Sequence, residues 1–147
     1  KVISIPYHTP EETSRAQKNN SLCTTKALLK KEFSVPLINL AYARSGDKGD
    51  HANIGVIARK QEYFDFIDRE LNPSTIAQFF SHVIQGEVLK WALPGINGIN
   101  FLLKNSLGGG GMTSLSIDPQ GKAYAQQLLE YPIPVTKKIF DQFQYKN

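Results

Sequence analysis

The sequence has a single cysteine and no long apolar run. Because Cys23 is alone, no internal disulfide can form, which suits a reducing compartment and predicts a cytoplasmic protein. No segment approaches the roughly 18 apolar residues that a membrane helix needs. The opening run Lys1–Pro6 is too short for a secretory signal. We therefore expect no membrane partner.

Several motifs of nucleotide and metal binding are also missing. The net charge is +4, but the lysines are scattered and do not alternate with aromatic residues, so we expect no nucleic-acid partner. The glycine spacing of a Walker loop is absent, and no dinucleotide fingerprint opens a helix. No His/Cys/Asp cluster has zinc-ligand spacing. The sequence thus gives no support to ATP, NAD or structural zinc.

The composition is that of one globular domain. Of the 147 residues, 41% are hydrophobic and 20% are charged, which is too apolar for a disordered chain. The polar stretch Thr9–Thr25 indicates that residues 1–36 are a linker or N-terminal extension, with a helical turn or two at Lys26–Lys31. The folded domain is expected over residues 37–135, and residues 136–147 are expected to form a C-terminal tail.

Apolar periodicity predicts alternating strands and helices. Strands are predicted over Leu37–Ala43, Asn53–Arg59, Leu89–Leu93, Thr113–Ile117 and Ile133–Val135. Helices are predicted over residues 63–71, 73–83, 97–106 and 119–129, the last with Asp118 as its N-cap. Leu89, Trp91 and Leu93 are expected on a buried strand face. This order predicts an α/β fold in which helices pack on one face of a mixed or antiparallel sheet.

The nine-residue loop 44–52 between the first two predicted strands is the main candidate for a functional site. Gly46 and Gly49 permit positive φ, so successive backbone N–H groups can converge on an anion, with help from Arg44 and Lys48. A phosphate or carboxylate would fit such a loop. Long ordered loops on a rigid scaffold often carry function.

The acidic residues of the same loop suggest a competing interpretation. Asp47 and Asp50 offer oxygen ligands for a divalent cation such as Mg²⁺ or Ca²⁺, and His51 beside them can carry a proton. Two carboxylates repel an unaccompanied anion. A third interpretation is a solvated loop, in which the carboxylates pair with Arg44 and Lys48 and serve the fold alone.

A second candidate segment is the uninterrupted glycine run Gly108–Gly111. Ordering four glycines costs about 2 to 4 kcal/mol relative to alanine. Either the run is mobile, or close approach of a ligand compensates for this cost. A pocket that joins the two segments would favour a ligand site, whereas an exposed hydrophobic sheet face would favour assembly.

Five segments resemble the C-terminal domain of the acyclic terpene utilisation (AtuA) family. They are Ala43–Arg59, Leu93–Gly95, Asn100–Phe101, Leu107–Gly111 and Asp118–Lys122. The resemblance covers most of the chain and implies a ferredoxin-like two-layer α/β sandwich. Such a domain usually follows a larger N-terminal domain, which is expected here in the same or another chain, and it is sometimes found alone.

The resemblance also implies a role in the breakdown of branched acyclic terpenoids, which proceeds through acyl-CoA thioesters. We expect a ligand-binding or catalytic accessory domain for an acyl-CoA or another small anion; the resemblance names no reaction and no catalytic residue. The alternative is a non-catalytic module for homo-oligomerisation or protein interaction. The candidate ligand-binding residues are Arg44, Ser45, Gly46, Asp47, Lys48, Gly49, Asp50, His51, Asn53, Gly108, Gly109, Gly110 and Gly111.

Overall fold

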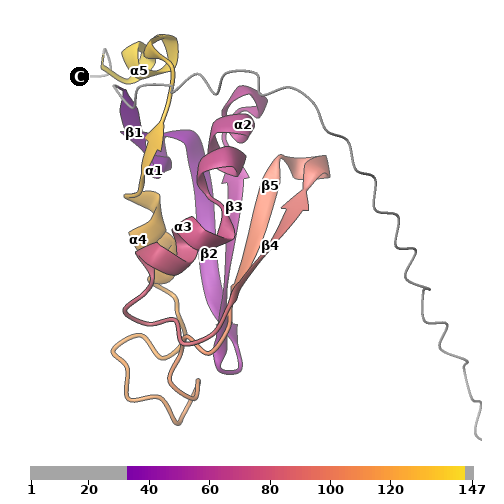
Figure 1. Cartoon of the computed structure of the whole chain (residues 1–147), viewed down its shortest axis with the longest axis vertical. Coiled ribbons are helices and arrows are strands. Elements are labelled where there is room, and N and C mark those ends of the chain that lie inside the picture. Colours follow the sequence, from indigo (N-terminus) through magenta and orange to yellow (C-terminus); the bar gives the residue numbers. More distant parts are fainter. Residues whose placement is uncertain (1–32, 145–147) are drawn as a thin grey trace, which may run out of the picture.

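A computed structural model describes residues 33–144, in which helices cover one face of a four-stranded antiparallel sheet (Figure 1). The helical turns expected at Lys26–Lys31 and most of the linker expected over residues 1–36 lie outside the described residues. Within the described part, Ser34–Pro36 already forms a strand, β1. No helix of the described part is long and apolar enough to cross a membrane.

The remaining elements follow in chain order. They are α1 (Leu37–Leu40), β2 (Ala41–Lys48), β3 (His51–Ala58), α2 (Gln61–Glu70), α3 (Pro73–Phe79), β4 (Val88–Leu93), the 3₁₀ turn η1 (Pro94–Ile96), β5 (Gly98–Leu103), α4 (Tyr124–Leu129), β6 (Pro132–Pro134) and α5 (Lys137–Gln144).

The main sheet has the strand order β2-β3-β5-β4, and all its neighbours are antiparallel. A ferredoxin-like fold has the element order βαββαβ. The chain shows this order from β3 onward as β3, α2 with α3, β4, β5 and α4, and β2, which precedes β3 in the sequence, occupies the place of the last strand. The chain thus has a ferredoxin-like sandwich whose final strand comes first in the sequence. β1 and β6 form a separate antiparallel pair.

The two faces of the sheet differ in burial. Side chains of one face pack under the helices: Ile54, Val56, Phe101 and Leu103 are at most 1% exposed. The other face, called here the open face, is not covered by any described helix. Trp91 lies on it and is 47% exposed, so the expectation that Trp91 belongs to the core is wrong. The strand itself was predicted correctly, but its buried face is the one that holds Val88.

Three predicted elements are replaced in the structure by others. The apolar run Leu37–Ala43 begins with the helical turn α1, because Leu37 and Leu40 are both buried at helical spacing, and becomes extended only at β2. The helix predicted over residues 97–106 is the strand β5, in which Ile99, Phe101 and Leu103 alternate on the buried face. The strand predicted over Thr113–Ile117 is absent from the structure, where this segment forms turns and bends.

The C-terminal part of the domain also differs from expectation. The helix α4 starts at Tyr124, later than predicted, and the Asp118 carboxylate accepts hydrogen bonds from the backbone N–H groups of Lys122 (2.9 Å) and Ala123 (2.8 Å) just before it. Residues 136–147, expected to be a tail, contain α5, which buries Ile139.

Candidate functional site

The polar segment between the first two predicted strands forms the end of a β-hairpin. Lys48 pairs with His51, so only Gly49 and Asp50 form the turn. Gly49 has a φ of 67°, which suits the first central position of a two-residue hairpin turn. The loop expected over residues 44–52 is therefore mostly strand. Its side chains alternate between the two faces of the sheet.

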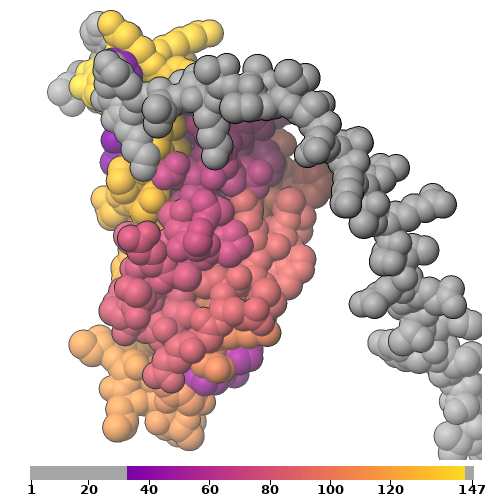
Figure 2. Space-filling view, in the orientation of Figure 1, coloured from indigo at the N-terminus to yellow at the C-terminus, as the bar shows by residue number. Residues whose placement is uncertain are grey.

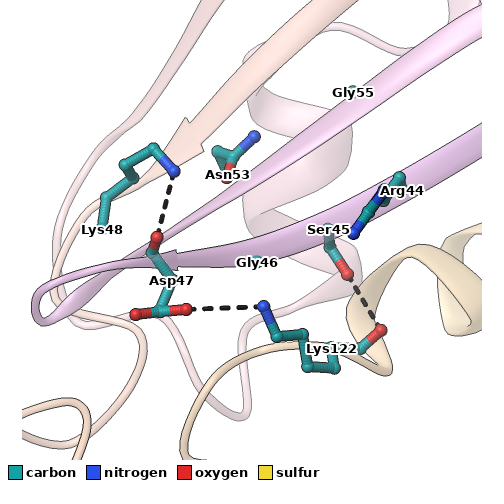
Figure 3. Close-up of a pocket in the computed structure, with 8 residues that line it drawn as sticks. All are labelled: Arg44, Ser45, Gly46, Asp47, Lys48, Asn53, Gly55 and Lys122. Carbon is teal, nitrogen blue, oxygen red and sulfur yellow. Dashed lines mark hydrogen bonds and ion pairs between the residues drawn. The ribbon is translucent and has the colours of Figure 1, made fainter.

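A hollow of about 360 Å³ lies at the β2 side of the open face (Figure 3). Its lining combines three cations, one carboxylate, one hydroxyl, one amide and two glycines. These residues are Arg44, Ser45, Gly46, Asp47, Lys48, Asn53, Gly55 and Lys122. Six of them were candidate ligand-binding residues, and Gly55 and Lys122 were not. Since Gly55 stands inside a predicted strand, where glycine is unfavourable, it was the signal that could have revealed the hollow.

The two glycines leave the hollow open although the fold does not require them. Gly46 lies opposite Asn53, and Gly55 lies opposite Arg44. A Cβ at Gly55 would approach no atom closer than 3.9 Å, and a Cβ at Gly46 would meet only the flexible end of Lys122 at 3.2 Å. Glycine inside a strand costs about 0.5 to 1 kcal/mol. Such a residue often marks a place where a ligand approaches the backbone closely.

The charged groups around the hollow leave a positive excess. Lys122 Nζ lies 3.5 Å from Asp47 Oδ1, and Lys48 Nζ donates a hydrogen bond to the backbone oxygen of Asp47 at 3.1 Å (Figure 3). The Arg44 side chain makes no hydrogen bond or ion pair with any described residue. Three cations against one carboxylate give a local charge of +2. The hollow therefore suits an anion, with Arg44 as its free donor.

Ser45 has a structural role behind the hollow. Its side chain is 7% exposed. The hydroxyl donates to the backbone oxygen of Lys122 (3.2 Å) and accepts from the backbone N–H of Ala125 (2.9 Å). These two bonds fix the start of α4 against β2. They also hold the backbone from which the Lys122 side chain reaches the hollow.

The hairpin turn and the glycine run hold each other in place. Asp50 Oδ1 accepts the backbone N–H of Gly109 at 2.6 Å, and the backbone oxygen of Asp50 accepts those of Ser106 (3.0 Å) and Leu107 (3.2 Å). The four glycines have φ values of 62°, 97°, 70° and 47°, all in the left-handed region. A Cβ at Gly110 would overlap the backbone of Gly49. The run is therefore ordered by contact with the hairpin.

His51 belongs to this second group. Its Nδ1 accepts the backbone N–H of Asn105 at 3.0 Å, which leaves Nε2 as the ring nitrogen that can donate. Nearby, the hydroxyl of the buried Ser106 accepts a hydrogen bond from the backbone N–H of Ala52 (3.1 Å). The backbone oxygen of Ser106 accepts one from the Tyr124 hydroxyl (2.8 Å). Burial raises the pKa of the Tyr124 phenol, and the charge of Asp118 adds to this effect.

The structure thus divides the candidate residues into two groups. Arg44, Gly46, Lys48 and Asn53 line the hollow together with Asp47, while Gly49, Asp50 and His51 bind the segment that holds Gly108–Gly111. The two carboxylates expected to share a cation have different partners. Among residues 33–144, no group of three or more His, Cys, Asp or Glu side chains is placed to hold a metal ion.

A second, apolar hollow of about 220 Å³ adjoins the first on the open face. Arg44 and Gly55 line both hollows, and the exposed side chains of Tyr42, Ile57, Leu93 and Ile96 are among the apolar lining of the second. The Tyr42 ring is stacked against the Arg59 guanidinium, whose carbon lies 3.8 Å from the ring centroid. This contact fixes the position of the ring beside the hollow. A charged and an apolar surface therefore meet at Arg44.

Comparison with known protein families gives one match. A family model described as the AtuA ferredoxin-like domain matches residues 35–134. The matched region begins in β1 and ends in β6, so it contains the whole sheet and both hollows. No curated protein and no solved structure matches the chain.

Proposed function

Because the chain belongs to the AtuA ferredoxin-like domain family, we propose that it is an accessory domain that binds a branched acyl-CoA or carboxylate metabolite. The observation that carries this proposal is the unpaired Arg44 guanidinium beside the glycine floor of a positively charged hollow. The hollow holds the anionic part of the ligand. The single cysteine suits a reducing compartment, so we place the domain in the cytoplasm.

Arg44 is the group best suited to recognise the anion. A guanidinium offers a planar set of donors that matches a carboxylate or phosphate through two parallel hydrogen bonds. Gly46 and Gly55 let the anion approach the strand backbone, and the Lys48 and Lys122 ammonium groups add positive charge. The repulsion expected from carboxylates is weak here, since Asp47 is paired with Lys122 and Asp50 is bound to Gly109.

The neighbouring groups favour binding over chemistry. The apolar hollow begins at Arg44 and can take the branched carbon chain of the ligand. The Ser45 hydroxyl, which lines the hollow, is tied by both its hydrogen bonds to the segment around α4. We therefore assign binding to this domain, and any reaction to a partner such as the larger N-terminal domain expected from the family.

The proposal is tested by calorimetric titration of the full chain. The ligands are 3-methylbutanoate, its CoA thioester, free coenzyme A and inorganic phosphate. Arg44→Gln removes the unpaired guanidinium and should weaken binding at least tenfold, which corresponds to about 1.4 kcal/mol. Gly55→Val fills the floor of the hollow and should weaken binding similarly with little change in stability, because the added Cβ has room.

Two controls make the titration decisive. Arg69→Gln removes a guanidinium that stacks on Phe66 at 5.4 Å, outside the hollow, and should leave the affinity unchanged. Mg²⁺ and Ca²⁺ are titrated separately, because Asp47 and Asp50 were predicted as cation ligands. If no anion binds the wild type, or if Arg44→Gln and Arg69→Gln have equal effects, the hollow is not an anion site.

A second candidate function is a non-catalytic assembly module. The observation in its favour is the set of exposed apolar side chains on or beside the open face: Tyr42, Ile57, Trp91, Leu93 and Ile96. Tyr42 is 60% exposed, and apolar groups gathered on one face commonly mark interaction surfaces. Homo-oligomerisation that needs no ligand, together with failure of every anion to bind, would favour this function over the first.

A further inference from the structure

The loop that follows the glycine run carries the most exposed apolar side chains of the described chain. Met112, Leu115 and Ile117 are 102%, 103% and 106% exposed, so they contact nothing outside their own backbone. Figures 1 and 2 show this loop in orange, standing out from the lower end of the molecule. Residues 108–117 include no charged side chain. Soluble monomers rarely present such a segment without a partner.

The same loop contains a segment whose sequence is typical of a β-strand. Over Thr113–Ile117, Leu115 and Ile117 alternate with Ser114 and Ser116, a pattern that in extended backbone places both large apolar side chains on one side. The structure shows no strand there. A short strand gains its stability from pairing, and no described strand of this chain pairs with Thr113–Ile117. The segment is therefore a strand donor.

The outer edge of β4 is a matching acceptor. β4 is the last strand in the sheet order, and no strand lies beyond it in the described residues. Trp91 and Leu93 point to the open face along this edge and are exposed. Proteins commonly protect a free edge with a lysine. The Lys90 ammonium does not serve this purpose, because it is 2.8 Å from the Asp68 carboxylate and donates to the Asp68 backbone oxygen at 2.7 Å.

We propose that Thr113–Ile117 of one copy of this chain adds to β4 of a second copy as a fifth strand. Backbone N–H and C=O groups of the two segments pair, and Leu115 and Ile117 pack beside Trp91 and Leu93 on the open face. Ser114 and Ser116 then point to the opposite side. The interaction needs no ligand and goes beyond the anion-binding function.

The partner is a second copy because each chain carries one donor and one acceptor of the same chemistry. The donor segment Thr113–Ile117 and the acceptor edge of β4 are both apolar and carry no unpaired charge. Within one chain, residues 85–87 lie between the base of the loop and β4, since Gln85 and Gly86 pair with Asn105 and Lys104. The loop also leaves on the hairpin side, where Gly109 is bound to Asp50. Reciprocal exchange between two copies uses both surfaces and closes the assembly as a two-fold dimer.

The first test measures the mass of the full chain in solution by light scattering over a range of concentrations. The wild type should be a dimer in the micromolar range. Leu115→Lys with Ile117→Lys should raise the dissociation constant at least 100-fold and leave the thermal midpoint of the monomer unchanged, because both side chains are exposed in the single chain. Ser116→Lys is the matched control on the other side of the same strand and should remain dimeric.

The second test identifies the contact by cross-linking in a Cys23→Ser background. Chains with Leu115→Cys are mixed with chains of a different mass that carry Leu93→Cys, and a short bismaleimide is added. We expect cross-links between the two kinds of chain. A wild type that stays monomeric at every concentration, a dimer that survives the double lysine variant, or a chain with both cysteines that cross-links only within itself would each overturn the proposal.

Discussion

Replacing Gly110 by alanine should destabilise the domain far more than the same change at Gly111, the next residue. Both glycines have positive φ, 70° and 47°, so both alanines pay for a left-handed backbone, which costs about 1 to 2 kcal/mol. The surroundings differ. A Cβ at Gly111 meets nothing within 4 Å, whereas a Cβ at Gly110 overlaps the backbone of Gly49 at the hairpin turn.

The additional cost at Gly110 is the loss of the contact between the hairpin and the glycine run. If the run moves away, the Asp50 carboxylate loses the N–H of Gly109, and hydrogen bonds to charged groups contribute about 1.5 to 3 kcal/mol. We therefore expect a loss of about 1 kcal/mol for Gly111→Ala and about 3 kcal/mol or more for Gly110→Ala.

Urea unfolding followed by tryptophan fluorescence measures both values, because Trp91 is the only tryptophan. Amide exchange at Gly109 provides a local readout, since its N–H should lose protection in Gly110→Ala and keep it in Gly111→Ala. Equal losses of unfolding free energy for the two variants would refute the reasoning. The run would then be stabilised by its own turns and not by the hairpin.

Further predictions concern the carboxylates and a buried phenol. Asp50→Asn should lower the unfolding free energy by about 1 kcal/mol because a charged acceptor becomes neutral. Asp47→Asn should change it by less than about 0.5 kcal/mol because its partner Lys122 is exposed. Urea unfolding measures both, and equal effects would contradict the assignment of the two carboxylates to different partners. Tyr124→Phe should cost about 1 kcal/mol at neutral pH through the lost bond to Ser106. Since the Tyr124 pKa is raised above 10.0, its stabilisation is complete below pH 10.0 and declines at higher pH, so the advantage of the wild type over Tyr124→Phe should shrink there; an advantage constant with pH would be evidence against this.

Local patterns were sufficient to predict the strands with unambiguous alternation and the paired helices. The helices α2 and α3 meet at Asn72 and Pro73, where the Asn72 side chain accepts the N–H of Thr75 at 2.9 Å, as its position before proline indicates. The fold class followed from the order of elements and from the family resemblance, and it is confirmed by the antiparallel sheet and the family match.

The errors occurred where one sequence suits two periods or where tertiary contacts decide. Ile99, Leu102 and Leu103 fit a helix, but Phe101 belongs to an alternating set that only the sheet could reveal. Trp91 was assigned to the core because large aromatic residues usually lie there, and sequence does not say which face of a strand the helices cover.

The candidate site was located better than it was understood. The polar residues from Arg44 to Asp50 were recognised as unusual, but their division between a hollow and a turn depends on the hairpin register, which places alternate side chains on opposite faces. Lys122 reaches the hollow only because Ser45 holds the start of α4 against β2. Contacts between residues 77 or 80 positions apart are not encoded in local spacing.

The pairing of β1 with β6 has a practical consequence for engineering. Ser34 lies opposite Pro134, and the ring of Phe140 in α5 lies 5.2 Å from that of Phe33, so the two ends of the described domain are near each other. A unit with neighbouring ends can be grafted into a surface loop of an unrelated host protein without stretching that loop apart. Residues 33–144 inserted into a fluorescent host protein would then allow binding on the open face to be followed as a change in the fluorescence of the host.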